Sequence, residues 1–135
     1  MAAIFRKTPD LTIEAILKTM VDGQVVETPF DCHFRNPTRS ERDAWRQHYE
    51  EQRKLPEDQR TGIHIDYADY LIGWSGIQDE DGEKFQFSEE NRALLLEDID
   101  WWSAIDEAFV QVINRSYLRK NSEPPSAGSI PETAE

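Results

Sequence analysis

The chain has 135 residues and a mass of 15.7 kDa, and its 38% apolar and 31% charged residues suit one folded domain rather than a collagen-like or wholly disordered chain. Its single cysteine excludes an internal disulfide, and no apolar run approaches the roughly 18 residues of a membrane span, so we expect a soluble intracellular protein without a signal peptide. The formal net charge is −12, with 16 acidic and 5 basic residues after position 60, and this balance predicts no binding to nucleic acid or to an anionic membrane.

Residues 10–35 are predicted to form an antiparallel β-ribbon. Asp22-Gly23 is favoured in two-residue hairpin turns, because both central positions need a positive φ. If the residues flanking this turn pair with each other, one face of the ribbon becomes almost wholly apolar. That face carries Leu11, Ile13, Ala15, Leu17 and Thr19 opposite Phe34, Cys32, Phe30, Thr28 and Val26. The other face is mostly polar, and it places Glu14 across from Asp31 as a mildly destabilising like-charge pair.

Four helices are expected after the ribbon, at about 39–54, 61–73, 88–98 and 101–118. Thr38-x-x-Glu41 has the spacing of a capping box, and the helix behind it is highly charged with one thin aromatic edge. From Ile63 to Trp74, apolar residues recur at spacings of three and four, which favours a second helix. Ser88 can cap the third helix, and the fourth carries a broad apolar stripe.

These elements predict an α+β fold in one domain over residues 1–120. An N-terminal antiparallel β-hairpin or small sheet packs with about four α-helices. Residues 121–135 contain three prolines and no aromatic side chain, so we expect a disordered, flexible C-terminal tail.

No pattern of catalytic, cofactor-binding or metal-ligating residues emerges. Asp79-x-Asp81-Gly82 partly resembles a calcium loop but fails on the spacing of its ligands. The three histidines lie on separate predicted elements, and glycine-rich phosphate loops and nucleophile elbows are missing. We therefore expect a protein that is not an enzyme and uses no cofactor or metal.

The aromatic and acidic residues of the second half are the candidates for contact with a protein partner. Trp101 and Trp102 point about 100° apart on a helix, so both can be buried only if the helix is widely covered. An exposed tryptophan is enriched in binding hot spots. The candidate partner-binding residues are Trp74, Asp79, Asp81, Trp101, Trp102 and Phe109.

Six short stretches, taken in order over about residues 65–121, resemble the tail assembly chaperones of long-tailed bacteriophages and prophages. They are Leu71-Ile72-Gly73-Trp74, Ile77-x-Asp79-Glu80-Asp81-Gly82, Phe85-x-Phe87-Ser88-x-Glu90-Asn91, Leu94-Leu95-Leu96, Ala104-Ile105-x-x-Ala108-Phe109 and Lys120-Asn121. The front hairpin followed by a charged helix is also similar to the amino-terminal layout of that family.

The resemblance implies a non-enzymatic protein of the bacterial host cytoplasm. Such chaperones bind the tape measure protein, keep it soluble, recruit tail tube subunits and are left out of the mature virion. A homo-oligomer is also possible on the sequence. An acidic surface with apolar grooves suits this role, because the long amphipathic partner exposes apolar stripes that would otherwise aggregate.

Two other classes of function stay open at this point. One is a small acidic inhibitor or adaptor that mimics nucleic acid, whose binding would weaken steeply with salt. The other is a carboxylate-dependent hydrolase, which would need a deep cleft that four short helices and a ribbon hardly enclose.

Overall fold

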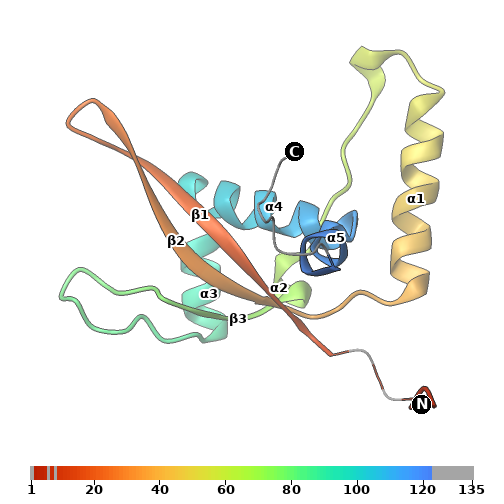
Figure 1. Cartoon of the computed structure of the whole chain (residues 1–135). Helices are drawn as coiled ribbons and strands as arrows, with labels where there is room; N and C mark the ends of the chain where they lie inside the picture. The colour runs from red at the N-terminus through yellow and green to blue at the C-terminus, as the bar shows by residue number, and fades with distance from the viewer. Residues whose placement is uncertain (1, 6, 8, 123–135) are drawn as a thin grey trace, which may run out of the picture.

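A computed structural model describes residues 2–5, 7 and 9–122 of the chain and confirms the α+β class (Figure 1). A three-stranded antiparallel sheet has the order β1-β2-β3, with β2 in the centre. The strands are β1 (Leu11–Val21), β2 (Gln24–Phe34) and β3 (Leu71–Ser75). The helices are α1 (Arg39–Arg53), α2 (Tyr67–Tyr70), α3 (Glu89–Leu96), α4 (Ile99–Ile113) and α5 (Ser116–Ser122), with a 3₁₀ turn at Glu57–Gln59. Among the described residues, no helix combines the length and apolar character needed to cross a bilayer.

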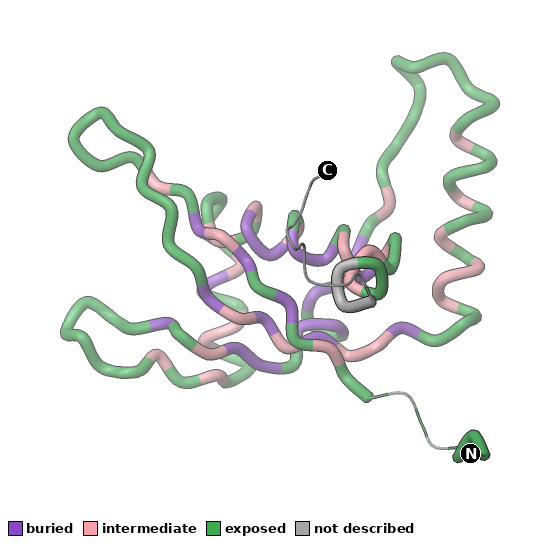
Figure 2. Tube along the Cα trace, viewed as in Figure 1, coloured by how far each residue is buried: buried purple, intermediate pink, exposed green. Residues whose placement is uncertain are grey.

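The predicted register of the β-ribbon is confirmed along its whole length. Leu11 pairs with Phe34 at the open end, and Val21 pairs with Gln24 beside the turn. Asp22 and Gly23, with φ of 50° and 78°, supply the left-handed backbone that a tight hairpin turn requires. The base of the ribbon is buried on its apolar face, whereas the tip extends beyond the core and is exposed (Figure 2). Exposed apolar side chains of the tip are Met20, Val21, Val25 and Val26.

The core lies between the base of the sheet and α4, which packs against β1. Ring centroids of Phe34 on β2 and Phe109 on α4 are 5.0 Å apart in an edge-to-face arrangement. The side chains that are most completely buried are Phe34, Phe109, Leu71, Ile105, Val112 and Cys32. The core thus brings together the ribbon near the N-terminus and α4 near the C-terminus. Each has an apolar face, and both faces are buried only when they pack against each other.

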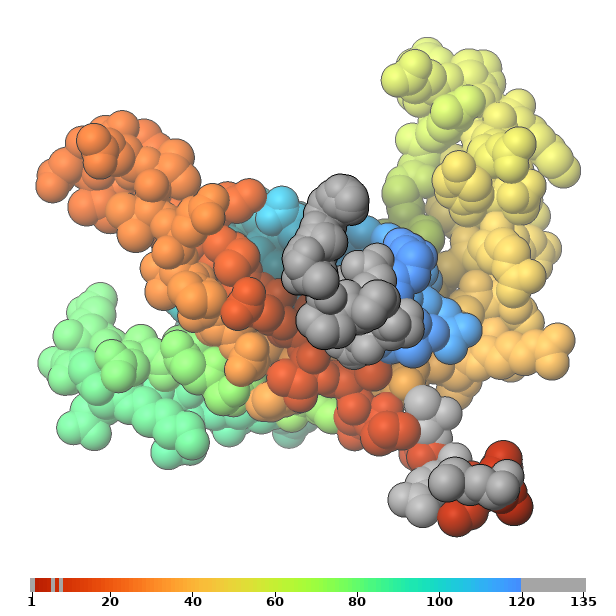
Figure 3. Space-filling model, viewed as in Figure 1, coloured from red at the N-terminus to blue at the C-terminus, as the bar shows by residue number. Residues whose placement is uncertain are grey.

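Helix α1 is attached to the body mainly through its first half. The capping box predicted at its start is present: Thr38 accepts a hydrogen bond from the backbone of Glu41, and Glu41 accepts one from the backbone of Thr38. No residue of α1 is buried, and Trp45 provides the aromatic edge that contacts Tyr70 and Phe109. In Figure 3 the α1 arm, in yellow, and the ribbon tip, in orange, project from different sides of the body.

The predicted helix over 61–73 is wrong. Residues 61–66 carry no helix, α2 spans only four residues, and residues 71–75 form strand β3 on the free edge of β2. The apolar spacing of three and four fits a helix, but pairing with β2 satisfies the backbone of this segment while still burying Leu71 and Trp74. At Gly73 a β-carbon would lie 3.1 Å from the ring of His33, so the close strand contact also favours glycine there.

The last predicted helix, over 101–118, is two helices. Helix α4 begins at Ile99 and ends at Ile113, and Arg115 adopts a left-handed backbone with φ of 57° before α5 begins. Helix α5 continues to Ser122, so the predicted flexible tail from residue 121 starts within a helix, and residues 123–135 lie outside the described residues.

Candidate protein-binding groove

A groove of about 430 Å³ lies between the 77–85 hairpin and the junction of α3 with α4. Its apolar lining comes from three elements: the hairpin supplies Ile77 and Phe85, α3 supplies Leu94 and Leu95, and α4 supplies Trp101. The polar residues that line it are Gln78, Asp79, Glu80 and Asp98, of which three are acidic. We call this site, with its apolar lining and acidic residues, the acidic groove.

The 77–85 hairpin is shaped by the side chain of Asp79. The Asp79 carboxylate accepts hydrogen bonds from the backbone N–H groups of Asp81 and Glu83 at 2.9 and 3.0 Å. Gly82 has a φ of 80°, and an isolated bridge joins Gln78 to Lys84. The sequence therefore closes a tight turn here, as its Asp-Gly pair predicts, and holds one wall of the acidic groove.

Trp74 supports this hairpin from beneath. Its indole N–H donates a 2.8 Å hydrogen bond to the carbonyl of Phe85, and the two rings stack with centroids 5.7 Å apart. Phe87 packs edge-on against the same indole at 4.8 Å. With only 7% of its surface exposed, Trp74 positions the groove rather than lining it.

The other wall of the acidic groove is formed by α3 and α4, and side-chain caps fix where these two helices begin. Ser88 accepts a hydrogen bond from the backbone of Asn91 at the start of α3. Asp98 caps α4 by accepting hydrogen bonds from Asp100 and Trp101 at 2.9 and 3.3 Å. The first turn of α4 consequently faces the groove, and Trp101 is wedged there against Phe30, with centroids 5.2 Å apart.

Beside the acidic groove the surface carries large apolar side chains. Leu94 lines the groove and is 62% exposed, while Ile99 and Trp102, one turn apart on α4, are 69% and 38% exposed. Three acidic residues, Glu97, Asp98 and Asp100, lie between Leu94 and Trp102 in the sequence. An exposed apolar surface bordered by charge is typical of a protein-binding site.

Comparison with known families gives one finding. The model of the YdaY prophage protein family matches residues 35–124, which is two thirds of the chain. The chain belongs to the YdaY prophage protein family. No curated protein and no solved structure matches it. In this YdaY family member the match begins directly after β2 and includes α1, the acidic groove and α4, whereas β1 and β2 lie wholly outside it.

The predicted contact residues of this YdaY family member fall into three groups. Asp79 and Trp101 come together in the acidic groove. Asp81, at the hairpin tip, and Trp102, on the next position of α4, are exposed nearby. Phe109 has no exposed surface and Trp74 very little, so both are structural.

Sequence reasoning did not identify several residues of the groove. They are Ile77, Phe85, Leu94, Leu95 and Asp98. One signal was present: three consecutive leucines on a short helix exceed what a single buried face can cover, so at least one must reach the surface.

A group of hydrogen-bonded, charged side chains of this YdaY protein lies away from the groove, where α1 meets α2. Arg35 donates two hydrogen bonds to Glu41 at 3.0 and 2.8 Å and one to Asp69 at 2.7 Å. Tyr70 donates to Glu41 at 2.5 Å, and its ring lies 4.4 Å from the Arg35 guanidinium. We call Arg35, Glu41, Asp69 and Tyr70 the Arg35 cluster.

Electrostatics in the Arg35 cluster follow from these contacts. The hydrogen bonds from Arg35 hold the pKa of Glu41 well below its usual range, despite partial burial. Burial, followed by the bond to Glu41, raises the pKa of Tyr70 to about 12. Arg35 directly follows β2, Glu41 lies on α1, and Asp69 and Tyr70 lie on α2, so the cluster links the start of α1 to the body beside the contacts of Arg42 and Trp45.

The single thiol of the chain, Cys32, is buried in the core. Burial raises the pKa of Cys32 to about 12, so the thiolate that a nucleophile needs is absent at neutral pH. Within the part of the chain that the structure describes, no three or more histidine, cysteine, aspartate or glutamate side chains converge as metal ligands do.

Proposed function

We propose that this prophage protein is a tail assembly chaperone that binds the tape measure protein through the acidic groove. The observation that carries the proposal is an apolar groove lined by exposed Leu94 and by three acidic residues, with exposed Ile99 and Trp102 nearby on α4. Such a surface fits one face of an amphipathic helix whose flanking residues are basic. Membership of a prophage family and the resemblance of residues 65–121 to tail assembly chaperones support the same role.

The proposed role defines where and how the protein acts. It would work without catalysis in the host cytoplasm, keep the tape measure protein soluble, bring it to tail tube subunits and be left out of the mature virion. Burial of a largely exposed leucine contributes up to roughly 1.5–3 kcal/mol, so a client that covers Leu94 gains an appreciable fraction of its binding free energy there.

The nucleic-acid mimic is the less favoured alternative, because the acidic residues of the groove are used locally. Asp79 closes the hairpin and Asp98 caps α4 through backbone hydrogen bonds. A mimic presents free carboxylates in a row like phosphates, whereas these are spaced by the turns that they stabilise. Client binding through apolar contacts should change little between low and high salt, and binding by a mimic should weaken steeply.

The test is co-expression with the tape measure protein of the same prophage, with the soluble fraction of that protein as the readout. The variant Leu94→Asp places a carboxylate in the groove, and Val110→Asp is the matched control, because Val110 is an exposed apolar residue of α4 that does not line it. We expect Leu94→Asp to lose most of the solubilisation and to weaken binding at least tenfold, about 1.4 kcal/mol. Equal behaviour of the two variants, or no solubilisation by the unaltered protein, would refute the proposal.

A further inference from the structure

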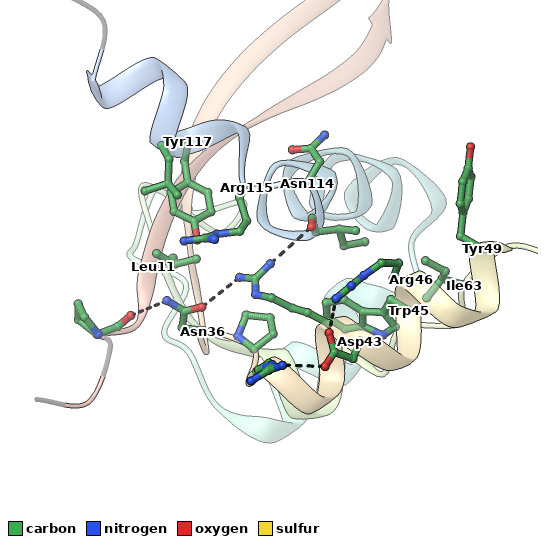
Figure 4. A pocket seen from close by; sticks show the side chains of 16 residues that line it. Leu11, Asn36, Asp43, Trp45, Arg46, Tyr49, Ile63, Asn114, Arg115 and Tyr117 are labelled. Carbon is green, nitrogen blue, oxygen red and sulfur yellow. Dashed lines mark hydrogen bonds and ion pairs between the residues drawn. The ribbon is translucent and has the colours of Figure 1, made fainter. Parts of the chain in front are cut away.

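A second hollow, larger than the acidic groove, separates α1 from the ends of α4 and α5 (Figure 4). Its volume of about 940 Å³ is near the upper end of the roughly 300–1,000 Å³ of typical ligand sites, which is room for several residues of a peptide. We call it the arginine cleft, because four of its lining residues are arginines. They are Arg39, Arg42 and Arg46 of α1 and Arg115 between α4 and α5.

The arginine cleft has the opposite charge to the rest of the molecule. Asp43 is the one acidic residue among its lining residues, so the lining carries a net charge of about +3 in a chain with a formal net charge of −12. Arg39 and Arg46 both pair with Asp43, and Arg42 donates 2.7 and 3.1 Å hydrogen bonds to the carbonyl of Val112 and to the side chain of Asn36. These contacts preorganise three of the guanidinium groups, and the single Asp43 carboxylate offsets only one of their positive charges.

The side chain of Arg115, unlike those of the other three arginines, is not held by an ion pair or a hydrogen bond to any described residue. Among the described residues its guanidinium has no such partner, although its backbone carbonyl accepts a 3.1 Å hydrogen bond from Leu118, and its backbone has a φ of 57°. Apart from Asp22 in the hairpin turn, it is the one described residue other than glycine with a positive φ. Glycine is favoured at this position after a helix, because it adopts a positive φ without strain. An arginine here is unfavourable for the backbone, and within the described part of the chain its side chain makes no hydrogen bond or ion pair that compensates. Such unfavourable residues concentrate at functional sites.

The floor of the arginine cleft is apolar and aromatic. Trp45 and Tyr49 of α1 line it, and Tyr49 is 59% exposed. The other apolar lining residues are Leu11, Ile63, Ile113, Tyr117 and Leu118, together with Pro9 and Pro37. Figure 4 shows Tyr117 and Arg115 facing the cleft from one side and Trp45 and Arg46 from α1 on the other.

We propose that the arginine cleft binds an acidic peptide segment of another protein, one that carries two or three carboxylates and one or two large apolar side chains. Three net positive charges match that number of carboxylates, and an arginine fork binds a carboxylate through two hydrogen bonds. A nucleic acid fits less well, because three net charges confined to one cleft match only a few phosphates and the acidic remainder of the chain repels the rest of the strand. The cleft and the acidic groove then accept partners of opposite charge, and this proposal does not depend on the identity of the groove's client.

The experiment uses the full chain and a fluorescein-labelled heptapeptide, Ser-Leu-Glu-Glu-Leu-Ser-Glu, blocked at both ends, which carries three carboxylates and two leucines. Fluorescence anisotropy compares it with the same peptide in which glutamine replaces each glutamate, and with a ten-base single-stranded oligonucleotide. We expect saturable binding of the acidic peptide alone, weakened at least tenfold by Arg115→Gly and by Arg46→Gln. The matched control is Arg53→Gln, which removes the same charge from α1 outside the cleft and should leave binding unchanged. Leu94→Asp should also leave it unchanged.

Several outcomes would overturn the proposal. The first is no binding of the acidic peptide at millimolar concentration, or binding that Arg115→Gly and Arg46→Gln leave intact. Another is tighter binding of the oligonucleotide that the same two variants abolish, which would assign the cleft to nucleic acid. A third is self-association, measured by sedimentation equilibrium. If Arg115→Gly abolishes it, the occupant of the cleft is a second copy of this chain.

Discussion

Replacing Glu41 by glutamine tests whether the Arg35 cluster holds α1 in place. Glutamine keeps the shape of the side chain but removes the charge that Arg35 and Tyr70 share through bonds of 2.5–3.0 Å. Hydrogen bonds to charged groups are each worth roughly 1.5–3 kcal/mol, and partial exposure, 29% for Arg35 and 26% for Glu41, reduces that value. Arg35 retains Asp69 as a partner, so we expect Glu41→Gln to lower the free energy of unfolding by about 2 kcal/mol.

The pH dependence follows from the direction of the pKa shift. Because the pKa of Glu41 is lower in the folded protein than its ordinary value of 4.5, its contribution is fully present above that value. It is lost as the pH falls through the folded pKa, since the protonated side chain no longer pairs with Arg35. The difference between the unaltered protein and Glu41→Gln should therefore be constant from pH 7 to about 5 and shrink at lower pH.

Urea unfolding followed by tryptophan fluorescence at several pH values measures both effects. For a domain of this size, about 2 kcal/mol corresponds to a fall in Tm of roughly 6–10 °C. Glu50→Gln is the matched control on the same helix: its partner Arg53 is exposed, and loss of such a surface pair should cost less than about 1 kcal/mol. If Glu41→Gln costs no more than this control, or if its effect persists unchanged in acid, the reasoning is wrong.

Three further predictions concern stability and use the same unfolding assay. Glu14→Thr removes the like-charge contact with Asp31 across the ribbon and should stabilise by roughly 0.2–1 kcal/mol; a loss of stability would contradict this. Arg115→Gly relieves a left-handed backbone that costs roughly 1–2 kcal/mol, offset by about 0.5–1 kcal/mol of glycine entropy, so a net gain of about 0.5–1 kcal/mol is expected. Phe109→Ala should cost about 3–5 kcal/mol, whereas Trp102→Ala, at a partly exposed position, should cost much less, and equal losses would show that the core is misassigned.

Local signals in the sequence determined the ribbon and the start of α1. The turn at Asp22-Gly23 fixes the pairing of every residue on either side, and the alternation of apolar side chains agrees with that register. The capping box of Thr38 and Glu41 likewise acts within four residues. Such features require no knowledge of distant segments, and the structure confirms them.

Tertiary contacts alone decided the strand that follows α2 and the place of the binding surfaces. Residues 71–75 satisfy a helical spacing as well as a strand, and the free edge of β2 selects the strand. Trp74 and Trp102 are the same residue type, yet one lies beneath the hairpin and the other is exposed, because burial depends on which elements meet. The acidic groove and the arginine cleft each join residues from three or more separate segments, so neither could be read from spacing along the chain. Turn and cap preferences act over a few residues, whereas a shared surface forms only once the burial of the apolar faces has brought distant segments together.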